Sequence, residues 1–365
     1  MSVVSKIEWT EKTWNPIRAR LRTDVPMPTK QHPLRVLRAG VWGYHCERVS
    51  PGCQNCYAEA MNGRMLPAWG TGLGYTIPNR EKVEIYLDEE ELQAPLKWRK
   101  PTMVFPCSMT DLFGEWVPDT MLERIWAVMA MCDRHTFQVL TKRADRLDWI
   151  PRQIGMAASL LEDHVEEFLG EYAALANWPL PNVWLGVSVE DQQRADERIA
   201  HLLQTPAALR WVSYEPALGP VDFSAISHDG RPCSEDQKGL NALTGEFRYY
   251  REDDGEPCSD WDAGLDWIVI GGESGSGARP FDLAWAHQTI GDCAAAGVPC
   301  FVKQLGALPV IGAEENLHEW PKHVIRDVWS GGDKVRLRHR KGGDPEEWHP
   351  ALRVRQMPER ALVQG

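Results

Sequence analysis

The sequence lacks several features that would assign it to a familiar class. No apolar run approaches the length of a membrane-spanning helix. The first residues, Met1 to Lys6, contain no apolar segment of the kind that signal peptides carry. There is no low-complexity segment, and no Walker or dinucleotide-binding glycine fingerprint. We therefore expect a cytoplasmic protein that makes no contact with a membrane.

The chain also lacks an excess of basic residues. Its formal net charge is −12, which argues against a protein that coats nucleic acid nonspecifically but leaves room for a local basic groove. The 9 cysteines are odd in number, and three are clustered, which favours metal binding or catalysis over a secreted disulfide framework. The 17 tryptophans suit a core or an interface, or stacking against bases or a cofactor.

The clustered cysteines are Cys46, Cys53 and Cys56, with the spacing C-x6-C-x2-C. The segment Ser50 to Gly52 predicts a turn in the longer gap. Thiolates on a tight loop suit a soft metal or an iron–sulfur cluster, and three ligands would leave one iron of a [4Fe–4S] cluster open. Two alternatives are a zinc site completed by His45 or a distant residue, and buried thiols without metal.

Short apolar segments alternate with helical ones along most of the chain. We expect a short strand and turn over 7–16, strands at 103–105, 136–140, 183–187, 209–212, 267–270 and 300–302, and helices at 57–65, 87–98, 119–132, 155–176, 191–203 and 283–296. This alternation predicts βαβ units and a parallel sheet. Counting a segment at the cysteines, about seven strands form an α/β fold, a full or partial TIM-like (βα) barrel.

One barrel domain is expected over 1–320, with the cysteine loop at 44–57 and a polar insertion at about 224–264. We interpret the insertion, which holds Cys233 and Cys258, as a surface excursion, and 17–42 as a loop. A C-terminal basic extension, 321–365, is expected to pack on the barrel. Within it, the alternation over 334–341 predicts a strand with a basic face that is either solvated or contacts phosphates.

Polar residues follow each predicted strand. In parallel α/β folds the carboxyl ends of the strands form the active-site edge, so we expect a functional rim there. A glycine-rich turn after the strand at 267–270 could also cradle a phosphate. The polar residues singled out at the strand ends are Ser108, Asp111, Lys142, Ser188, Glu190, Glu215, Glu273 and Lys303.

A set of short motifs runs through nearly the whole chain. They are Thr13-Trp14-Asn15-Pro16, Ser50-Pro51-Gly52-Cys53 with Cys56-Tyr57-Ala58, residues 185–190, Ser213-x-Glu215-Pro216, residues 271–275, Arg279-Pro280 and Lys303-Gln304-x-Gly306. Together they resemble the phage Gp37/Gp68 family, also called the three-Cys-motif proteins. In that family the first motif usually runs almost directly into the first cysteine, whereas residues 17–43 intervene here.

More remotely, the chain is similar to spore photoproduct lyase and its relatives among the radical S-adenosylmethionine (radical SAM) enzymes. This resemblance rests on the cysteine loop, the strand end Leu140-Thr141-Lys142 and the strand end Val187-Ser188. The usual radical SAM spacing is C-x3-C-x2-C, so the first gap is longer here. The resemblance implies a partial (βα)6 barrel that holds a [4Fe–4S] cluster and S-adenosylmethionine.

Roles for individual residues follow from this resemblance. The three clustered cysteines would ligate three irons, and S-adenosylmethionine would chelate the fourth and be cleaved by reduction to a radical that abstracts a substrate hydrogen. Ser108, Lys142 and Ser188 are expected to contact that cofactor, and Glu190 its ribose or amine. Cys107 stands where a thiol could donate hydrogen to a substrate radical, or it is a buried strand-end cysteine.

Three later residues, Glu215, Glu273 and Lys303, are expected to bind substrate or to act as acids or bases. The alternative is a structural ion pair, for example between Glu273 and Lys303.

The implied function is a radical SAM-type enzyme in DNA repair or nucleic-acid modification, reduced by a donor such as flavodoxin or ferredoxin. Two alternatives stay open. One is a non-catalytic, metal-stabilised barrel that binds nucleic acid or protein. The other is a metal-dependent hydrolase that uses the carboxylates Asp111, Glu190, Glu215 and Glu273.

Overall fold

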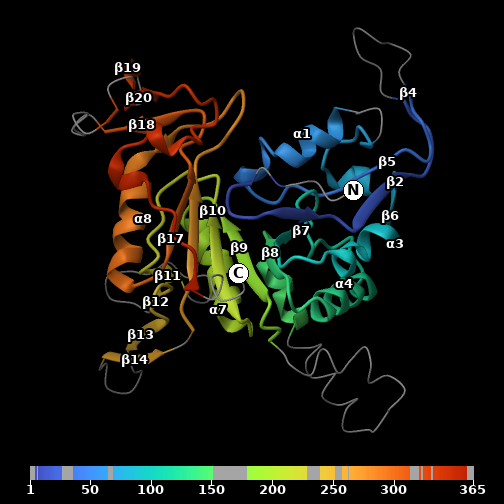
Figure 1. The fold of residues 1–365 in the computed structure, drawn as a ribbon, viewed down its shortest axis with the longest axis horizontal. Coiled ribbons are helices and arrows are strands. Elements are labelled where there is room, and N and C mark those ends of the chain that lie inside the picture. Colours follow the sequence, from blue (N-terminus) through green and yellow to red (C-terminus); the bar gives the residue numbers. More distant parts are fainter. Residues whose placement is uncertain are drawn as a thin grey trace. The chain divides into compact units, whose positions relative to one another are not determined.

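The computed structural model describes residues 5, 7–26, 36–64, 69–150, 179–227, 239–250, 257–261, 263–312, 320–321, 324–329 and 332–359. The chain divides into two compact units (Figure 1). The first comprises Met1–Arg143 and Arg152–Val183, and the second Ala144–Pro151 and Trp184–Gly365. The helix predicted over 155–176 lies outside the described residues.

Seven parallel strands follow the order β1-β7-β8-β9-β10-β15-β17. This arrangement confirms the predicted α/β class and a partial TIM-like fold, with helices between most successive strands and the strands β11 to β14 between β10 and β15. The first strand, β1, lies within the predicted strand and turn over 7–16 and confirms it. The segment at the cysteines was counted as a strand of this sheet, and that prediction was wrong. The bounds are β1 Lys12–Trp14, β7 Met103–Pro106, β8 Thr136–Thr141, β9 Val183–Val189, β10 Leu209–Tyr214, β15 Trp267–Gly271 and β17 Cys300–Gln304.

The first unit adds short helices and antiparallel strands to β1, β7 and β8. The helices are η1 (Pro51–Cys53), α1 (Tyr57–Gly63), α2 (Ile77–Arg80), α3 (Glu89–Leu92), η2 (Ala94–Lys97) and α4 (Asp119–Met131). The further strands are β2 (Ile17–Leu21), β3 (Val25–Pro26), β4 (Val36–Leu37), β5 (Trp42–Gly43) and β6 (Val83–Leu87), with β2 between β5 and β6.

Two predictions for the first unit were wrong. The expected loop over 17–42 contains strands, because Ile17, Ala19 and Leu21 alternate with two arginines and turn one face inward. The expected helix over 87–98 is broken into α3 and η2, since Pro95 cannot continue the hydrogen bonding of an α-helix.

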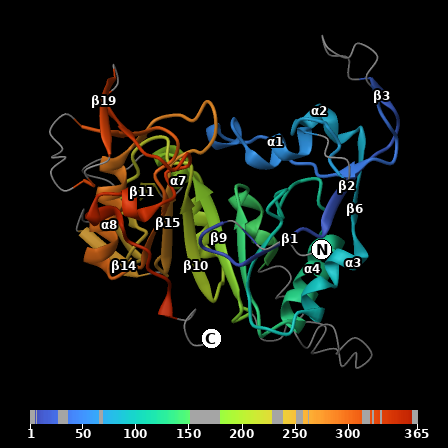
Figure 2. The same cartoon turned by 45° about the horizontal axis from the view of Figure 1, so that its top comes forward.

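In the second unit, helices α7 (Gln192–Gln204) and α8 (Leu283–Ala296) alternate with the parallel strands as predicted. Helix α8 packs beside β15 and β17 (Figures 1 and 2). It begins at an aspartate, Asp282, whose side chain accepts a hydrogen bond from the Ala284 backbone, and it ends at Gly297 in the left-handed conformation. No helix of the described residues is long and apolar enough to cross a bilayer.

Smaller elements complete the second unit. One four-stranded sheet is β11 (Ile226–Ser227), β12 (Gly239–Asn241), β13 (Glu246–Tyr250) and β14 (Pro257–Trp261). A second, in the order β16-β18-β20-β19, contains β16 (Phe281–Asp282), β18 (Pro309–Ile311), β19 (Ile325–Trp329) and β20 (Gly332–Arg336). The 3-10 helices are η3 (Ala144–Asp148), η7 (Pro345–Glu347) and η8 (Pro350–Leu352).

Two predictions about these segments change. The insertion is more than a surface excursion, because its described residues form the sheet β11–β14; Cys233 lies outside the described residues. The strand expected over 334–341 ends at Arg336.

Aromatic side chains fill the core beside the parallel strands of the second unit. The ring centroids of Trp211 and Trp267 lie 5.4 Å apart, and those of Trp184 and Trp267 lie 5.9 Å apart. All three side chains are buried. Gly186 in β9 makes room for them, because a Cβ there would lie 2.5 Å from two atoms of the Trp211 indole. Here the tryptophans serve packing.

The Gly186→Ala substitution should therefore destabilise the protein by about 1–3 kcal/mol, because the added methyl overpacks the core. The matched control is Gly291→Ala in α8, where a Cβ meets nothing within 4 Å. That change should be neutral or stabilise by up to about 1 kcal/mol, because alanine favours a helix. Urea unfolding followed by tryptophan fluorescence measures both. Equal effects of the two substitutions would contradict the packing described for Trp211.

Candidate functional site

The three clustered cysteines lie on one loop of the first unit. After Cys46 the chain turns through η1, where the Cys53 backbone N–H donates to the Ser50 carbonyl at 3.0 Å. Cys56 is the N-cap residue of α1, with extended backbone angles. This placement confirms that Cys53 and Cys56 precede a helix, whose N-terminus favours negative charge.

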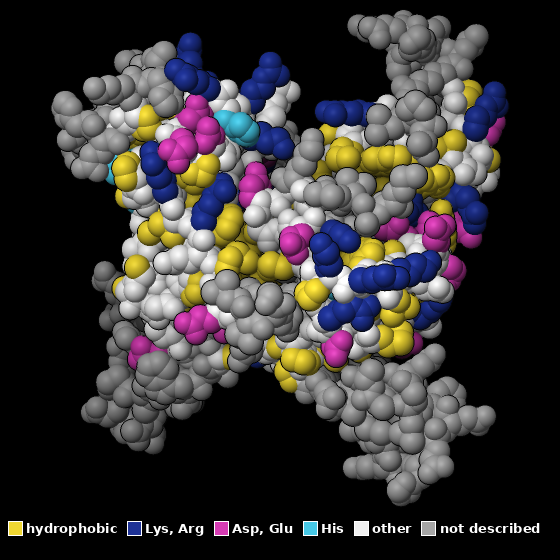
Figure 3. All heavy atoms as spheres, in the orientation of Figure 1, with side chains coloured by type: hydrophobic (Ala, Val, Ile, Leu, Met, Phe, Trp, Pro, Cys, Tyr) yellow, Lys and Arg dark blue, Asp and Glu magenta, His cyan; other side chains and the backbone are white. Residues whose placement is uncertain are grey.

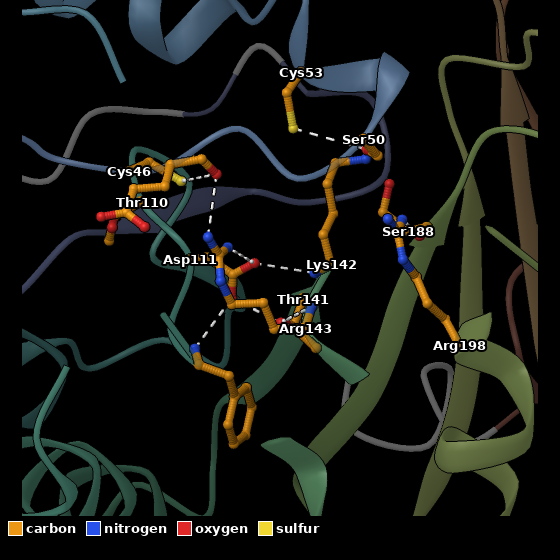
Figure 4. Close-up of polar contacts among 12 residues, drawn as sticks. Cys46, Ser50, Cys53, Thr110, Asp111, Thr141, Lys142, Arg143, Ser188 and Arg198 are labelled. Atoms are coloured by element: carbon orange, nitrogen blue, oxygen red, sulfur yellow. Dashed lines mark hydrogen bonds and ion pairs between the residues drawn. The ribbon is translucent and has the colours of Figure 1, made fainter. Parts of the chain in front are cut away.

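The peptides on both sides of Cys46 are held by side chains from the ends of two parallel strands. Thr110, which follows β7, donates its hydroxyl to the His45 carbonyl at 2.5 Å. Arg143, which follows β8, donates from Nη2 to the Glu47 carbonyl at 3.1 Å. The loop is thereby fixed to the carboxyl edge of the strands in this unit (Figure 4).

Two tyrosines attach the neighbouring segments to the same edge. The Tyr57 hydroxyl donates to the Ser108 carbonyl at 2.6 Å, and the Tyr75 hydroxyl donates to the Met109 carbonyl at 2.7 Å. Tyr57 follows Cys56 directly, so this hydrogen bond also fixes the start of α1. The cysteine loop and the end of β7 therefore form one hydrogen-bonded assembly.

A buried carboxylate organises the end of β8. Asp111 accepts hydrogen bonds from the Thr141 hydroxyl at 2.7 Å and from the Lys142 backbone N–H at 3.0 Å. It also pairs with Arg143 at 3.2 Å, and the two side chains are only 7% and 8% exposed. The Arg143 guanidinium lies 4.5 Å from the centroid of the Trp116 ring. Arg143 is thus held in a single orientation when it reaches the cysteine loop.

A second ion pair supports the loop from its other side. Glu47 accepts two hydrogen bonds from Arg80, at 2.5 and 2.7 Å, and lies 3.2 Å from His45 Nε2. Burial acts to raise the pKa of the Glu47 carboxyl, but hydrogen bonds from Arg80 and His45 outweigh it and hold the pKa below its ordinary value. Burial lowers the pKa of His45.

Two of the three thiols, Cys46 and Cys56, lie where burial opposes the thiolate form. Burial raises the pKa of Cys46, and the nearby charges of Asp111, Cys56 and Cys53 act on it as well. Burial also raises the pKa of Cys56, although backbone N–H groups at the start of α1 act to lower it. Cys46 and Cys56 both pack against the same apolar cluster. Thiolates would form here only with a compensating positive charge, such as a metal centre provides.

The present side-chain positions do not complete a metal site. Among the described residues, no group of three or more His, Cys, Asp or Glu side chains is arranged to hold a metal ion. The Cys53 sulfur lies 3.8 Å from the Ser50 hydroxyl, in the turn between the first two cysteines. Ligation by all three thiols therefore requires the loop to close around the metal centre. The donor set fits a three-cysteine cluster by residue type and by its place on a single loop.

The two residues after β7 are strongly constrained. Cys107 is buried and has a φ of 57°, the positive region that favours glycine, and its backbone N–H donates to the Trp14 carbonyl at 2.7 Å. Burial raises the pKa of the Cys107 thiol. Asn15 exchanges hydrogen bonds with the Ser108 hydroxyl at 3.1 and 3.2 Å and accepts the Met109 N–H at 3.0 Å.

Lys142 extends from the end of β8 toward the part of the loop that contains Ser50 and Cys53 (Figure 4). Its side chain is half-buried. Of the predicted site residues, the first unit thus brings together the three cysteines, Cys107, Ser108 and Lys142, all at or above the ends of β7 and β8.

Sequence reasoning did not assign roles to several residues of this assembly. Asn15 lies in a recognised motif, but nothing in the motif says that it orders the end of β7. Arg143 follows the recognised Thr-Lys strand end, and its orientation depends on the distant Asp111. Glu47 and Arg80 carry no local signal, because their ion pair joins residues 33 positions apart.

In the second unit, Ser188 lies near the end of β9, and Glu190 is the first residue after that strand. The Ser188 hydroxyl donates to the Glu215 carbonyl at 3.3 Å. The Glu190 side chain is fully buried and pairs with Arg198 at 3.2 Å. Arg198 also donates to the Ser188 carbonyl at 2.5 Å. The Glu190 carboxylate therefore stabilises the contact between β9 and α7.

The remaining predicted residues of the second unit form two separate ion pairs. Lys303 donates to both carboxylate oxygens of Glu215, at 2.7 and 2.9 Å, and Gln304 donates to the same carboxylate at 3.1 Å. Glu273 pairs with Arg279 at 2.5 Å. The predicted alternative, an ion pair between Glu273 and Lys303, was therefore wrong, because each of these residues pairs with a different partner. A structural ion pair exists, but between Lys303 and Glu215.

The glycine-rich turn serves backbone packing at its start. A Cβ on Gly272 would lie 2.7 Å from the Leu305 carbonyl oxygen, and one on Gly306 would lie 2.8 Å from the Glu273 carbonyl oxygen. Gly275 and Gly277 have positive φ values of 105° and 89° with open space around them. These two positions need glycine for the turn conformation.

Comparison with known proteins gives one match. A family model described as "Protein of unknown function (DUF5131)" matches residues 40–340. No curated protein and no solved structure matches the chain.

Replacing Asp111 by Asn should destabilise the protein by about 3–5 kcal/mol, because Arg143 is left as an unpaired buried charge. The control is Glu89→Gln, which breaks an ion pair with Arg124 whose side chains are 57% and 51% exposed. That change should cost much less, because solvent screens an ion pair at the surface. Chemical denaturation compares the two variants. A loss at Asp111 no larger than the loss at Glu89 would show that the buried pair does not hold this edge together.

Proposed function

The chain belongs to the DUF5131 family, whose description assigns no activity, and from its own residues we propose that it is a radical SAM-type enzyme. In this proposal Cys46, Cys53 and Cys56 hold a [4Fe–4S] cluster, and the open iron binds S-adenosylmethionine. When bound, these groups supply a 5′-deoxyadenosyl radical that removes a hydrogen atom from a substrate. The resemblance to the lyases points to a nucleic-acid substrate.

One observation carries the proposal: the three-cysteine loop is attached to the carboxyl edge of parallel strands. Thr110 and Arg143 hold the peptides beside Cys46, and Tyr57 holds the residue after Cys56. In parallel α/β folds this edge is where active sites form. A purely structural zinc loop has no need to be anchored at this edge.

The ligand chemistry supports the same proposal. Three half-buried thiols on one loop gain most from a polynuclear metal centre, which would neutralise three thiolates together. Cys56 also lies at a helix N-terminus, where backbone N–H groups favour the thiolate. The three residues therefore suit the role of cluster ligands better than that of isolated buried thiols.

The residues around the loop suit a charged cofactor. Lys142 supplies a cation on a flexible stem beside the loop, which fits a carboxylate such as that of methionine. The Ser108 hydroxyl is oriented by Asn15 and half-buried, so it can serve as a fixed donor or acceptor.

Cys107 fits the role of a hydrogen donor to a substrate radical. Because burial raises its pKa, the thiol stays protonated, which is the form that carries a transferable hydrogen atom. Its positive φ fixes the position of the side chain at the end of β7.

The strand-end carboxylates favour this proposal over a metal-dependent hydrolase. A hydrolase needs carboxylates available as metal ligands. Here each of the four candidates already has its own cation: Asp111 with Arg143, Glu190 with Arg198, Glu215 with Lys303, and Glu273 with Arg279. The proposed enzyme gives a reason for the position of Lys142 beside the cysteine loop, namely binding of the cofactor carboxylate. A non-catalytic binding protein gives no such reason.

Anaerobic purification followed by reconstitution with iron and sulfide tests the proposal. The wild-type protein should bind about four irons and four sulfides per chain and should form 5′-deoxyadenosine from S-adenosylmethionine under a chemical reductant. Single Cys→Ser changes at 46, 53 and 56 should each lower this formation at least about tenfold.

The matched control is Cys132→Ser, at a buried free cysteine after α4, outside the loop. It should keep both the metal and the cofactor cleavage. One zinc ion per chain with no cleavage of the cofactor by the wild-type protein would refute the proposal. Equal metal loss in Cys132→Ser would show that the loop is not the metal site.

A further inference from the structure

A basic segment of the second unit stands out against the charge of the whole chain. Residues 334–341 contain five Lys or Arg side chains and no acidic residue, while the chain as a whole has a net charge of −12. The segment begins in β20 and continues past its end at Arg336. Arg336, Arg338, Arg340 and Lys341 are exposed. We refer to residues 334–341 as the basic segment.

The backbone of the basic segment is held in place by a buried carboxylate. Glu347, which is 4% exposed, accepts the backbone N–H groups of Arg338 at 3.0 Å and His339 at 2.9 Å. His339 Nδ1 in turn accepts the Gly343 N–H at 2.9 Å. The segment thus has a defined backbone, and both carboxylate oxygens of Glu347 accept backbone N–H groups.

The same segment is docked at the carboxyl end of β17. The Gly342 carbonyl accepts the Leu305 N–H at 2.9 Å and the Trp348 indole N–H at 3.0 Å. Gly342 has a φ of 59°, and a Cβ there would lie 2.6 Å from the Gly306 carbonyl oxygen. The basic segment therefore adjoins the strand end that carries Lys303, at the carboxyl edge of the parallel strands in this unit.

Its outward side chains are available to an external anion. Arg338, Arg340 and Lys341 make no side-chain hydrogen bond or ion pair with any residue that the structure describes. Two acidic residues that follow the segment have other partners: Asp344 accepts the Glu346 backbone N–H at 3.1 Å, and Glu346 lies 3.9 Å from Arg353. Asp327 and Asp333 lie in β19 and β20, beside Lys334 at the start of the segment. Figure 3 shows Lys and Arg side chains over the region of β18 and β20, with acidic side chains among them.

We propose that the basic segment binds the phosphate backbone of a nucleic acid and presents it to the strand ends of the second unit. Two arginines and a lysine on one fixed loop match regularly spaced phosphates, and the arginine fork suits phosphate oxygens. The inference that this nucleic acid is the substrate rests on the proposed enzymatic function. The inference that the segment binds nucleic acid does not depend on it.

A lipid surface fits the segment less well than a nucleic acid. Stable membrane binding needs apolar side chains that enter the bilayer in addition to charge. The large hydrophobic side chains found exposed among the described residues are Val49, Tyr57, Ile77, Leu96 and Met131, and all belong to the first unit.

The test is fluorescence anisotropy with a labelled 20-nucleotide single strand and the matching duplex, between 50 and 200 mM salt. The variant R338Q/R340Q/K341Q in the full chain should bind about 10- to 100-fold more weakly at the lowest salt. The slope of log affinity against log salt should fall by about 2–3, because each lost phosphate contact removes about 0.7–0.9.

The matched control is K97Q/R99Q/K100Q, which removes the same charge from three exposed cations. These residues precede β7 and so lie at the opposite, amino end of a parallel strand in the first unit. This variant should bind like the wild-type protein. The unfolding midpoint of R338Q/R340Q/K341Q should also equal the wild-type value. The reason is that Glu347 fixes the backbone of the segment through N–H groups, which the three side-chain substitutions leave in place.

Three results would each overturn the proposal: no binding of either nucleic acid by the wild-type chain at 50 mM salt, equal losses in the two triple variants, or tighter binding of poly-glutamate or phosphatidylserine vesicles than of nucleic acid. The metal content of each variant is measured in parallel. If R338Q/R340Q/K341Q loses nucleic-acid binding and keeps its cluster, the result supports this inference. If the protein binds nucleic acid normally but contains no cluster, the result contradicts only the proposed enzymatic function.

Discussion

The buried ion pair of Asp111 with Arg143 is the interaction on which the first unit's site depends. Asp111 joins the end of β7 to the end of β8, because it accepts from Thr141, from the backbone of Lys142 and from Arg143. Arg143 then carries this order to the peptide beside Cys46. A buried charge pair is retained here at a desolvation cost, and its gain is a defined position for the cysteine loop.

Pairing of a carboxylate with a cation also occurs at the other strand ends of the two units. Carboxylates that follow parallel strands are each matched by one cation, so the edge carries ordered dipoles and little unbalanced charge. The half-buried groups beside the cysteine loop include a cation, Lys142, a hydroxyl, Ser108, and the thiols. This edge fits the hydrogen-atom transfer proposed above better than a hydrolysis, because its paired carboxylates are not available as metal ligands.

The sequence predicts the parallel strands well because they are buried on both faces and read as continuous apolar runs, as in Val183–Val189. It predicts α8 at its exact bounds because Asp282 and Gly297 mark the two ends. It fails at β2, where two arginines obscure the alternation. Ion-pair partners are also hidden from sequence, since Lys303 and Glu215 are 88 residues apart and meet only through the fold.

The central claim is that the cysteine loop holds a cluster with one open iron. Electron paramagnetic resonance of the anaerobically reconstituted and reduced protein, recorded with and without S-adenosylmethionine, tests it most directly. The account predicts the signal of a reduced [4Fe–4S] cluster whose shape changes when the cofactor is added, and which disappears in the Cys46→Ser variant. A cluster signal that the cofactor leaves unchanged, or no cluster signal in a protein that retains zinc, would contradict the account.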